Sequence, residues 1–258
     1  MGQVTLVQGA EEAVNDKTPG FGGQIVVITG ATGGLGRAIA ARLIASGATA
    51  ILLGRTRRSL DELLAETGWS ADAVRCYPVD LDVEAAIREG TQDICNRYPH
   101  VHALIHAAGL ISLGSVERSQ LGDLDRQYHV NVRAPYQLTQ SLLPRMLTCG
   151  GQVVFVNSSV GIKAREGVSQ YAATKHALRA VADSLRDEVN GRGVRVLSVF
   201  LGRMASGLQA AVHQHETLHY DPARLLQPED VASLILNVLQ LPRTAEVTDL
   251  HIRPALRP

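Results

Sequence analysis

The chain has 258 residues, of which 45% are hydrophobic and 4% aromatic, and its 25 basic residues balance its 25 acidic ones. This balance excludes a chain-wide field that would attract nucleic acid or an anionic membrane, so neither is an expected partner. The length suits one large α/β domain or two small ones. A core poor in aromatic residues must be built from Ala, Val, Leu and Ile, which is typical of parallel strands covered by helices.

The cysteines indicate the compartment, and the first residues indicate where the domain begins. The three cysteines show no CxxC spacing, which predicts neither a disulfide framework nor a zinc site and favours a reducing compartment, the cytoplasm. No apolar run reaches the ~18 residues of a membrane span. Residues 1–23 lack a basic region followed by an apolar run, so a signal peptide is not expected. We interpret them as an N-terminal extension, with one short strand at 4–7, before a domain over 24–258.

Short apolar runs alternate with amphipathic stretches along the rest of the chain. The short apolar runs predict strands, and apolar residues at helical spacing predict helices. Gly47 is a suitable helix stop, and Ser59 would cap a helix with Glu62 at the capping-box position. The expected strands are 24–29, 49–53, 74–78, 101–106, 152–157, 194–200 and 245–252, and the expected helices are 35–46, 59–66, 83–98, one or two within 116–146, 169–190 and 228–239.

The alternation of strands and helices predicts an α/β fold. Right-handed βαβ units at this spacing build a doubly wound parallel sheet. No internal repeat or linker divides the chain, so a single domain is expected. Residues 202–227 are the least patterned, and segments of this length inside a compact domain are usually functional lids.

A glycine-rich turn leads from the first strand into the first helix. Glycines without Cβ atoms let the backbone approach a pyrophosphate, and the helix N-terminus offers free N–H groups and a positive dipole end. The strand–turn–helix context favours this interpretation over a tight turn that merely connects two elements. The cofactor-binding residues expected here are Gly30, Thr32, Gly33, Gly34, Leu35 and Gly36.

The end of the second strand indicates which dinucleotide fits. An acidic residue there would bind the ribose hydroxyls of NAD, but the chain has Arg55 and no carboxylate. The guanidinium could bind a 2′-phosphate and stack on adenine, which favours NADP (NADPH) over NAD, against the alternative of a solvated basic loop. Asp80 could accept from the adenine amino group with help from the Leu81 backbone, although a simple loop aspartate fits the spacing almost as well.

Tyr171 and Lys175 lie four residues apart in a predicted helix, so both side chains share one face. A nearby ammonium group favours phenolate and lowers the tyrosine pKa toward useful acid–base work. The pair alone is weak evidence, because such spacing is common. Ser158, at the end of the fifth strand, would reach the same crevice and polarise a carbonyl. Ser159 is the competing choice.

The chain resembles the short-chain dehydrogenase/reductase family over about residues 24–255. This resemblance implies a Rossmann fold and an NAD(P)-dependent oxidoreductase that interconverts a carbonyl and an alcohol on a small molecule, with a subunit that forms a homodimer or homotetramer. No metal is required. The matching segments are Thr29–Gly36, Asp80, His106–Gly109, Asn131, Ser158–Gly161, Tyr171–Lys175 and Leu201-Gly202.

The resemblance also implies residue roles. Tyr171 would protonate the carbonyl oxygen, Lys175 would lower the tyrosine pKa and hold the nicotinamide ribose, and Ser158 would orient the substrate oxygen. Asn131 would hold a water that connects Lys175 to bulk solvent. The hydride belongs to the cofactor. Further cofactor contacts would come from Ala107, Ala108, Gly109, Gly202 and Ser206.

Two departures from the family pattern concern the cofactor's surroundings. His106 stands where the family has an asparagine that braces the sheet, and Leu201 replaces the proline before Gly202. They leave open an alternative class, a dinucleotide-binding regulatory or scaffold protein without turnover.

Three further features remain open at this stage. The histidines at 213, 215 and 219 could line a lid or contact substrate, whereas a metal site there is the weaker interpretation. Segments 110–114 and 163–168 would border the substrate. Within the second, Arg165 and Glu166 could bind something polar or simply face water.

Overall fold

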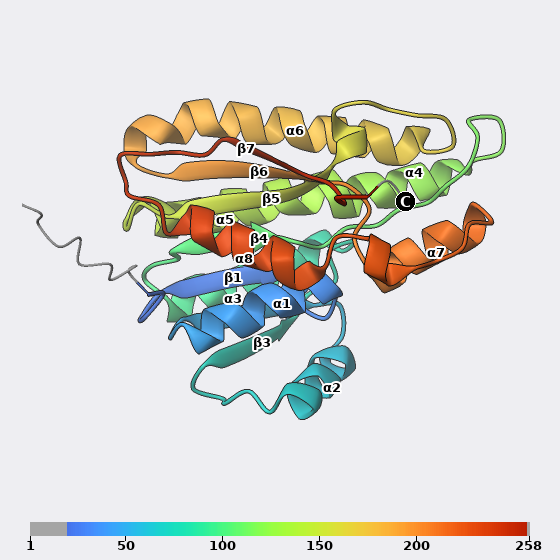
Figure 1. Ribbon diagram of the computed structural model, residues 1–258. Helices are drawn as coiled ribbons and strands as arrows, with labels where there is room; N and C mark the ends of the chain where they lie inside the picture. The colour runs from blue at the N-terminus through green and yellow to red at the C-terminus, as the bar shows by residue number, and fades with distance from the viewer. Residues whose placement is uncertain (1–19, 257–258) are drawn as a thin grey trace, which may run out of the picture.

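A computed structural model describes residues 20–256, so the strand expected at 4–7 lies outside the described residues. The strands form one parallel sheet in the order β3-β2-β1-β4-β5-β6-β7 (Figure 1). This single α/β domain confirms the predicted doubly wound fold. The strands are β1 (Ile25–Thr29), β2 (Thr49–Gly54), β3 (Val74–Pro78), β4 (Ala103–His106), β5 (Gln152–Ser158), β6 (Arg195–Leu201) and β7 (Asp249–Ile252).

Helices cover both faces of the sheet and enclose two hydrophobic clusters. Helices α1, α2 and α8 supply the first cluster, and α3, α5 and α6 supply the second. The α-helices are α1 (Gly34–Ala45), α2 (Arg57–Thr67), α3 (Glu84–Arg97), α4 (Leu121–Tyr128), α5 (Ala134–Leu147), α6 (Ser169–Val189), α7 (Gly207–His215) and α8 (Pro228–Leu239). Short π or 3-10 turns are η1 (His129–Arg133), η2 (Ser159–Gly161), η3 (Asn190–Arg192) and η4 (Pro222–Arg224).

The strands are apolar on both sides because both faces are covered. In β1, Val26 and Ile28 pack into the first cluster while Val27, between them, packs into the second. Successive strand side chains point to opposite faces, so a strand covered on both faces must be apolar throughout. Each such side chain contributes roughly 1.5–3 kcal/mol when fully buried. The central strands therefore hold the sheet's C-terminal edge, and the turns that follow it, in place.

Several local boundaries differ from the sequence prediction. The strands expected from residues 101 and 245 begin at Ala103 and Asp249. Thr56, not Ser59, caps α2, and its hydroxyl accepts from the Ser59 N–H at 3.2 Å. The helical region expected from residue 116 starts only at Leu121. The segment 202–227 is not irregular throughout, because it contains α7 and η4; Figure 1 shows α7 outside the two helical layers. Its apolar residues are too few to reveal that helix from periodicity.

The last residues of the expected N-terminal extension touch the domain. Phe21 is buried in the first hydrophobic cluster, and the Gly23 N–H donates to the Gly47 carbonyl at 3.2 Å. The packed part of the chain therefore includes Phe21. Within residues 20–256, no helix has the length and apolar character needed to cross a bilayer.

Candidate active site

A cleft of about 450 Å³ opens where β1, β4, β5 and β6 lead into the segments that follow them. Elements far apart in sequence meet here because parallel strands end at the same edge of the sheet. The predicted residues that line it are Gly30, Thr32, Gly33, Gly34, Leu35, Gly36, Ala107, Ala108, Gly109, Ser158, Tyr171, Lys175, Gly202 and Ser206. Ser159 lines it too, but its side chain is exposed.

The glycine turn packs too closely to admit side chains. Gly30 has φ +66°, and a Cβ there would lie 2.8 Å from the Ala108 backbone. A Cβ on Gly36 would lie 2.8 Å from the Gly30 carbonyl carbon and 2.9 Å from Ala31 Cα. Helix α1 has no side-chain cap and no acidic residue in its first turn. Its first N–H groups therefore offer an anion site that suits a pyrophosphate.

Tyr171 and Lys175 lie one turn apart at the start of α6, and the Lys175 Nζ is 5.7 Å from the centre of the Tyr171 ring. The Lys175 ammonium donates to the Val156 carbonyl at 3.0 Å. Asn157, which the sequence interpretation did not single out, links this helix to β5. Its amide donates to the Lys175 carbonyl at 3.0 Å, and its oxygen accepts from the Ser158 N–H at 2.7 Å. Asn157 thus holds the end of β5 against the start of α6.

Burial governs the protonation of this pair. Removal from water raises the pKa of Tyr171 to about 12, although the neighbouring Ser158 hydroxyl acts in the opposite direction. Desolvation also lowers the pKa of Lys175 to about 8. The protein chain alone therefore does not lower the tyrosine pKa as expected, because low polarity disfavours both charged forms. At neutral pH Tyr171 keeps its proton.

Asn131 is buried in η1, a π-helical turn between α4 and α5. Its side-chain oxygen accepts from the Leu110 N–H at 2.8 Å, and its amide donates to the Leu110 carbonyl at 2.8 Å and to the Thr174 hydroxyl at 3.1 Å. Asn131 therefore clamps the loop after β4 against α6. The predicted water-holding role stays a prediction. The sequence pattern does not predict the π-helical turn.

His106, at the end of β4, is buried between strands and helix. Its Nε2 lies 2.9 Å from the Thr139 hydroxyl, and its ring stacks on Phe155. Burial, with a smaller contribution from the Lys175 charge, lowers the pKa of His106 to about 3. The imidazole is therefore neutral at physiological pH and can connect β4 to α5 without a buried charge.

The low pKa of His106 makes stability depend on pH. The unfolded chain protonates this histidine near pH ~6.5, whereas the folded chain does not until about pH 3. The unfolded state binds more protons in that window, so the free energy of unfolding falls as the pH falls, by up to about 1.4 kcal/mol per pH unit from this group. Urea unfolding from about pH 7 to about pH 5 should show a smaller slope in His106→Asn. Equal slopes would contradict this assignment.

Three predicted cofactor residues lie outside the cleft lining. Arg55 is exposed just after β2, and Asp80 and Leu81 are half-buried after β3. The Asp80 carboxylate accepts from the Asp82 N–H at 3.0 Å, which is the simple loop role considered above. Arg55 follows β2, which pairs with β1, and the other two follow β3, the next strand outward. All three thus lie on the side of the sheet where an adenosine would extend from the glycine turn.

The segment after β6 supplies the predicted residue Ser206 and also Arg203, a cleft residue that sequence reasoning did not weigh. Ser206 lines the cleft but also caps α7, since its hydroxyl accepts from the Gln209 N–H at 3.1 Å. Arg203 lines the cleft as well, and so does Arg165 from the loop after η2. Arg165 and Arg203 are close because β5 pairs with β6, and patterns in a single sequence do not reveal that pairing. Of the three local histidines, His213 is buried while His215 and His219 are exposed.

Comparisons with known proteins agree with this geometry. The profile of the short chain dehydrogenase family matches residues 24–217. The chain belongs to this family. A short-chain type dehydrogenase/reductase of Sinorhizobium fredii is 31% identical over 237 residues, covering 90% of this chain and 91% of the relative. The family member described here is therefore an oxidoreductase of the NAD(P)-dependent dehydrogenase/reductase class.

Solved structures of the family share the fold. A short-chain dehydrogenase from Streptomyces avermitilis superposes with a TM-score of 0.78 at 29% identity, covering 89% of this chain and 88% of that one. A structure from Escherichia coli CFT073, assigned to the short chain dehydrogenases and complexed with NADPH, gives a TM-score of 0.81 at 29% identity, with coverages of 91% and 98%.

Proposed function

We propose that this short-chain dehydrogenase reduces a carbonyl group on a small molecule with NADPH. The observation that carries the proposal is the meeting of Tyr171, Lys175 and Ser158 in one cleft with the glycine turn. The cradle at Gly30 and Gly36, which Cβ atoms would fill, fits a pyrophosphate. The bound cofactor would supply the hydride.

The side chains of the cleft would supply the proton and the orientation. Tyr171, protonated at neutral pH, would donate its hydroxyl proton to the carbonyl oxygen. Ser158 holds the same oxygen by a hydrogen bond. The Lys175 ammonium would stabilise the phenolate left behind and hold the nicotinamide ribose. A tyrosine that keeps its proton is in the form that a general acid for carbonyl reduction needs.

The test is NADPH oxidation, followed by absorbance, with a panel of aliphatic and aromatic ketones and aldehydes. Turnover that is lost in Tyr171→Phe supports the proposal. Tight NADPH binding without turnover of any panel member would favour instead the regulatory or scaffold class.

NADPH is preferred over NADH in this proposal because of Arg55. Arg57 and Arg58 pair with Asp61 and Glu62, whereas Arg55 has no side-chain partner among residues 20–256. Its guanidinium is thus available for a 2′-phosphate. The NADPH complex of the Escherichia coli relative is in keeping with this choice.

The Arg55 assignment predicts a selective loss of affinity. A hydrogen bond to a charged group contributes roughly 1.5–3 kcal/mol, so Arg55→Ala should weaken NADPH binding about 10- to 100-fold and leave NADH binding nearly unchanged. Fluorescence titration of both cofactors measures this. Arg58→Ala is the matched control, since its guanidinium already pairs with Glu62. Equal affinities for the two cofactors in the wild-type protein would refute the assignment.

We also propose a homodimer or homotetramer in a reducing compartment, the cytoplasm. Apolar or aromatic side chains are exposed on α4 and α5, including Leu121, Tyr128 and Tyr136, and a partner subunit would cover them. The three cysteines are free thiols, in keeping with a reducing compartment. Light scattering that gives a monomer mass at micromolar concentration would contradict the assembly.

A further inference from the structure

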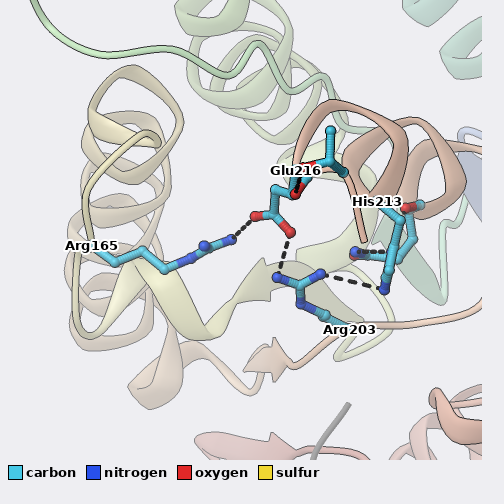
Figure 2. Close-up of polar contacts among 6 residues, drawn as sticks. Arg165, Arg203, His213 and Glu216 are labelled. Carbon is cyan, nitrogen blue, oxygen red and sulfur yellow. Dashed lines mark hydrogen bonds and ion pairs between the residues drawn. The ribbon is translucent and has the colours of Figure 1, made fainter. Parts of the chain in front are cut away.

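Two arginines that line the cleft share one carboxylate (Figure 2). Arg165 comes from the loop between η2 and α6, Arg203 follows β6, and Glu216 lies at the C-terminal end of α7. Arg165 donates to Glu216 Oε1 at 3.0 Å, and Arg203 donates to Oε2 at 2.6 Å. Each oxygen of one carboxylate thus binds a different guanidinium. Charge-assisted pairs of this kind recognise carboxylates strongly and with defined geometry.

Glu216 is ionised in this arrangement. Partial burial alone would raise its pKa, but hydrogen bonds and Coulomb attraction from Arg203 and Arg165 outweigh that effect, and the net pKa is lowered. The carboxylate is only 18% exposed and Arg203 only 24%, while Arg165 is 48% exposed. Water therefore screens the Arg203 pair less than an ordinary surface pair.

Arg203 is further held by His213, which is buried. The His213 Nδ1 lies 2.8 Å from the Gln209 carbonyl oxygen and 3.1 Å from the Gln209 side-chain nitrogen. The Nε2 atom lies 3.4 Å from Arg203 Nη1. The His213 ring also meets Tyr220 edge to face. The Arg203 guanidinium is thus held by Glu216 on one side and by His213, which carries no negative charge, on the other.

The charged side chains that line the cleft are all basic. Among the described residues that line it, the ionisable side chains are Arg165, Tyr171, Lys175 and Arg203, and none is acidic. Glu216 bridges the two arginines and neutralises only one of their two charges. A cleft with a surplus of positive charge attracts an anionic ligand.

We propose that the substrate carries a carboxylate, which Arg165 and Arg203 bind at the position that Glu216 takes in this structure. The proposal rests on the carbonyl reduction assigned above, since it names the class of substrate for that site: a keto acid. Exchange of one carboxylate for another would keep both charge-assisted pairs of the arginines. Because Glu216 ends α7, substrate binding would also release that end of the helix.

The experiment compares pyruvate, acetoacetate and levulinate with their methyl esters, which differ mainly in charge. For wild type we expect kcat/KM with NADPH to be at least tenfold higher for one acid than for its ester. Arg165→Met and Arg203→Met should each lower that acid-to-ester ratio about tenfold. Glu216→Gln removes the competing charge and should raise the ratio severalfold. Arg88→Met, exposed on α3 and away from the cleft, should leave the ratio unchanged.

Three results would overturn the proposal: a wild-type ratio near one for every pair, a lower ratio in Glu216→Gln, or equal losses for acid and ester with weakened NADPH binding in Arg203→Met. The last would show that the arginine holds the cofactor. Ester turnover reports whether each variant is folded.

Calorimetry on Tyr171→Phe with bound NADP separates this proposal from the proposed function. Binding of an acid but not of its ester supports the carboxylate site even if no carbonyl is ever reduced. Absence of acid binding refutes it even if neutral ketones are reduced by the wild type.

Discussion

Tyr171→Phe is expected to lower kcat for NADPH-dependent carbonyl reduction by about 10²- to 10⁴-fold, the usual contribution of a general acid. The substitution removes only the hydroxyl that would protonate the carbonyl oxygen. Because the ring remains beside Lys175, the fold and the cofactor cradle should be preserved. Single-turnover kinetics with saturating NADPH and ketone measure the loss at the chemical step.

The control is Tyr98→Phe, which removes a tyrosine hydroxyl outside the cleft at the end of α3. It should leave kcat unchanged. NADPH affinity, measured by fluorescence titration, should change less than about threefold in Tyr171→Phe. Retained turnover in that variant would refute the acid role of Tyr171, whereas a loss of activity that follows a loss of NADPH binding would assign the residue to cofactor binding.

Gly36→Ala is expected to reduce both stability and NADPH affinity. The new Cβ would lie within 3 Å of the Gly30 and Ala31 backbone, and backbone atoms yield less easily than a side chain. Overpacking of this kind costs about 1–3 kcal/mol in the free energy of unfolding. Since the clash falls within the glycine turn, we expect NADPH affinity to fall at least about tenfold. Urea unfolding and fluorescence titration measure the two effects separately.

The matched control is Gly122→Ala, in α4, where a Cβ meets open space. There alanine should raise the free energy of unfolding by about 0.5–1 kcal/mol, because glycine is the poorer helix residue. If Gly36→Ala behaved like Gly122→Ala, the close approach within the turn would not be a requirement of the fold.

Much of the fold and part of the site could be predicted from the sequence because they depend on neighbours along the chain. The β-branched runs, the glycine turn before α1 and the four-residue spacing of Tyr171 and Lys175 are local patterns. Each one reports a backbone conformation or a helical face directly. Parallel pairing then follows from the alternation of elements, which brings Ser158 to the same edge of the sheet. The strand boundaries accordingly agree to within a few residues.

Helix α7 and the cap of α2 are two features that local sequence patterns did not predict. In the segment after β6 the apolar spacing is weak, so no helix was expected, although Ser206 caps one. At α2 both Thr56 and Ser59 are suitable caps by type, and only the backbone course selects Thr56. Capping depends on the exact residue at which the chain turns into the helix, which propensity does not resolve.

The sequence by itself therefore determined the sheet, the glycine turn and the pairing of Tyr171 with Lys175 on one helix face, since these are properties of short stretches. Only the tertiary structure decided that His106 is buried and neutral, that Asn131 clamps Leu110, and that Glu216 bridges Arg165 and Arg203. These depend on contacts between segments 13 to 51 residues apart. Burial and Coulomb interactions act through space, so a residue's charge and partners are set only when distant segments of the chain pack together.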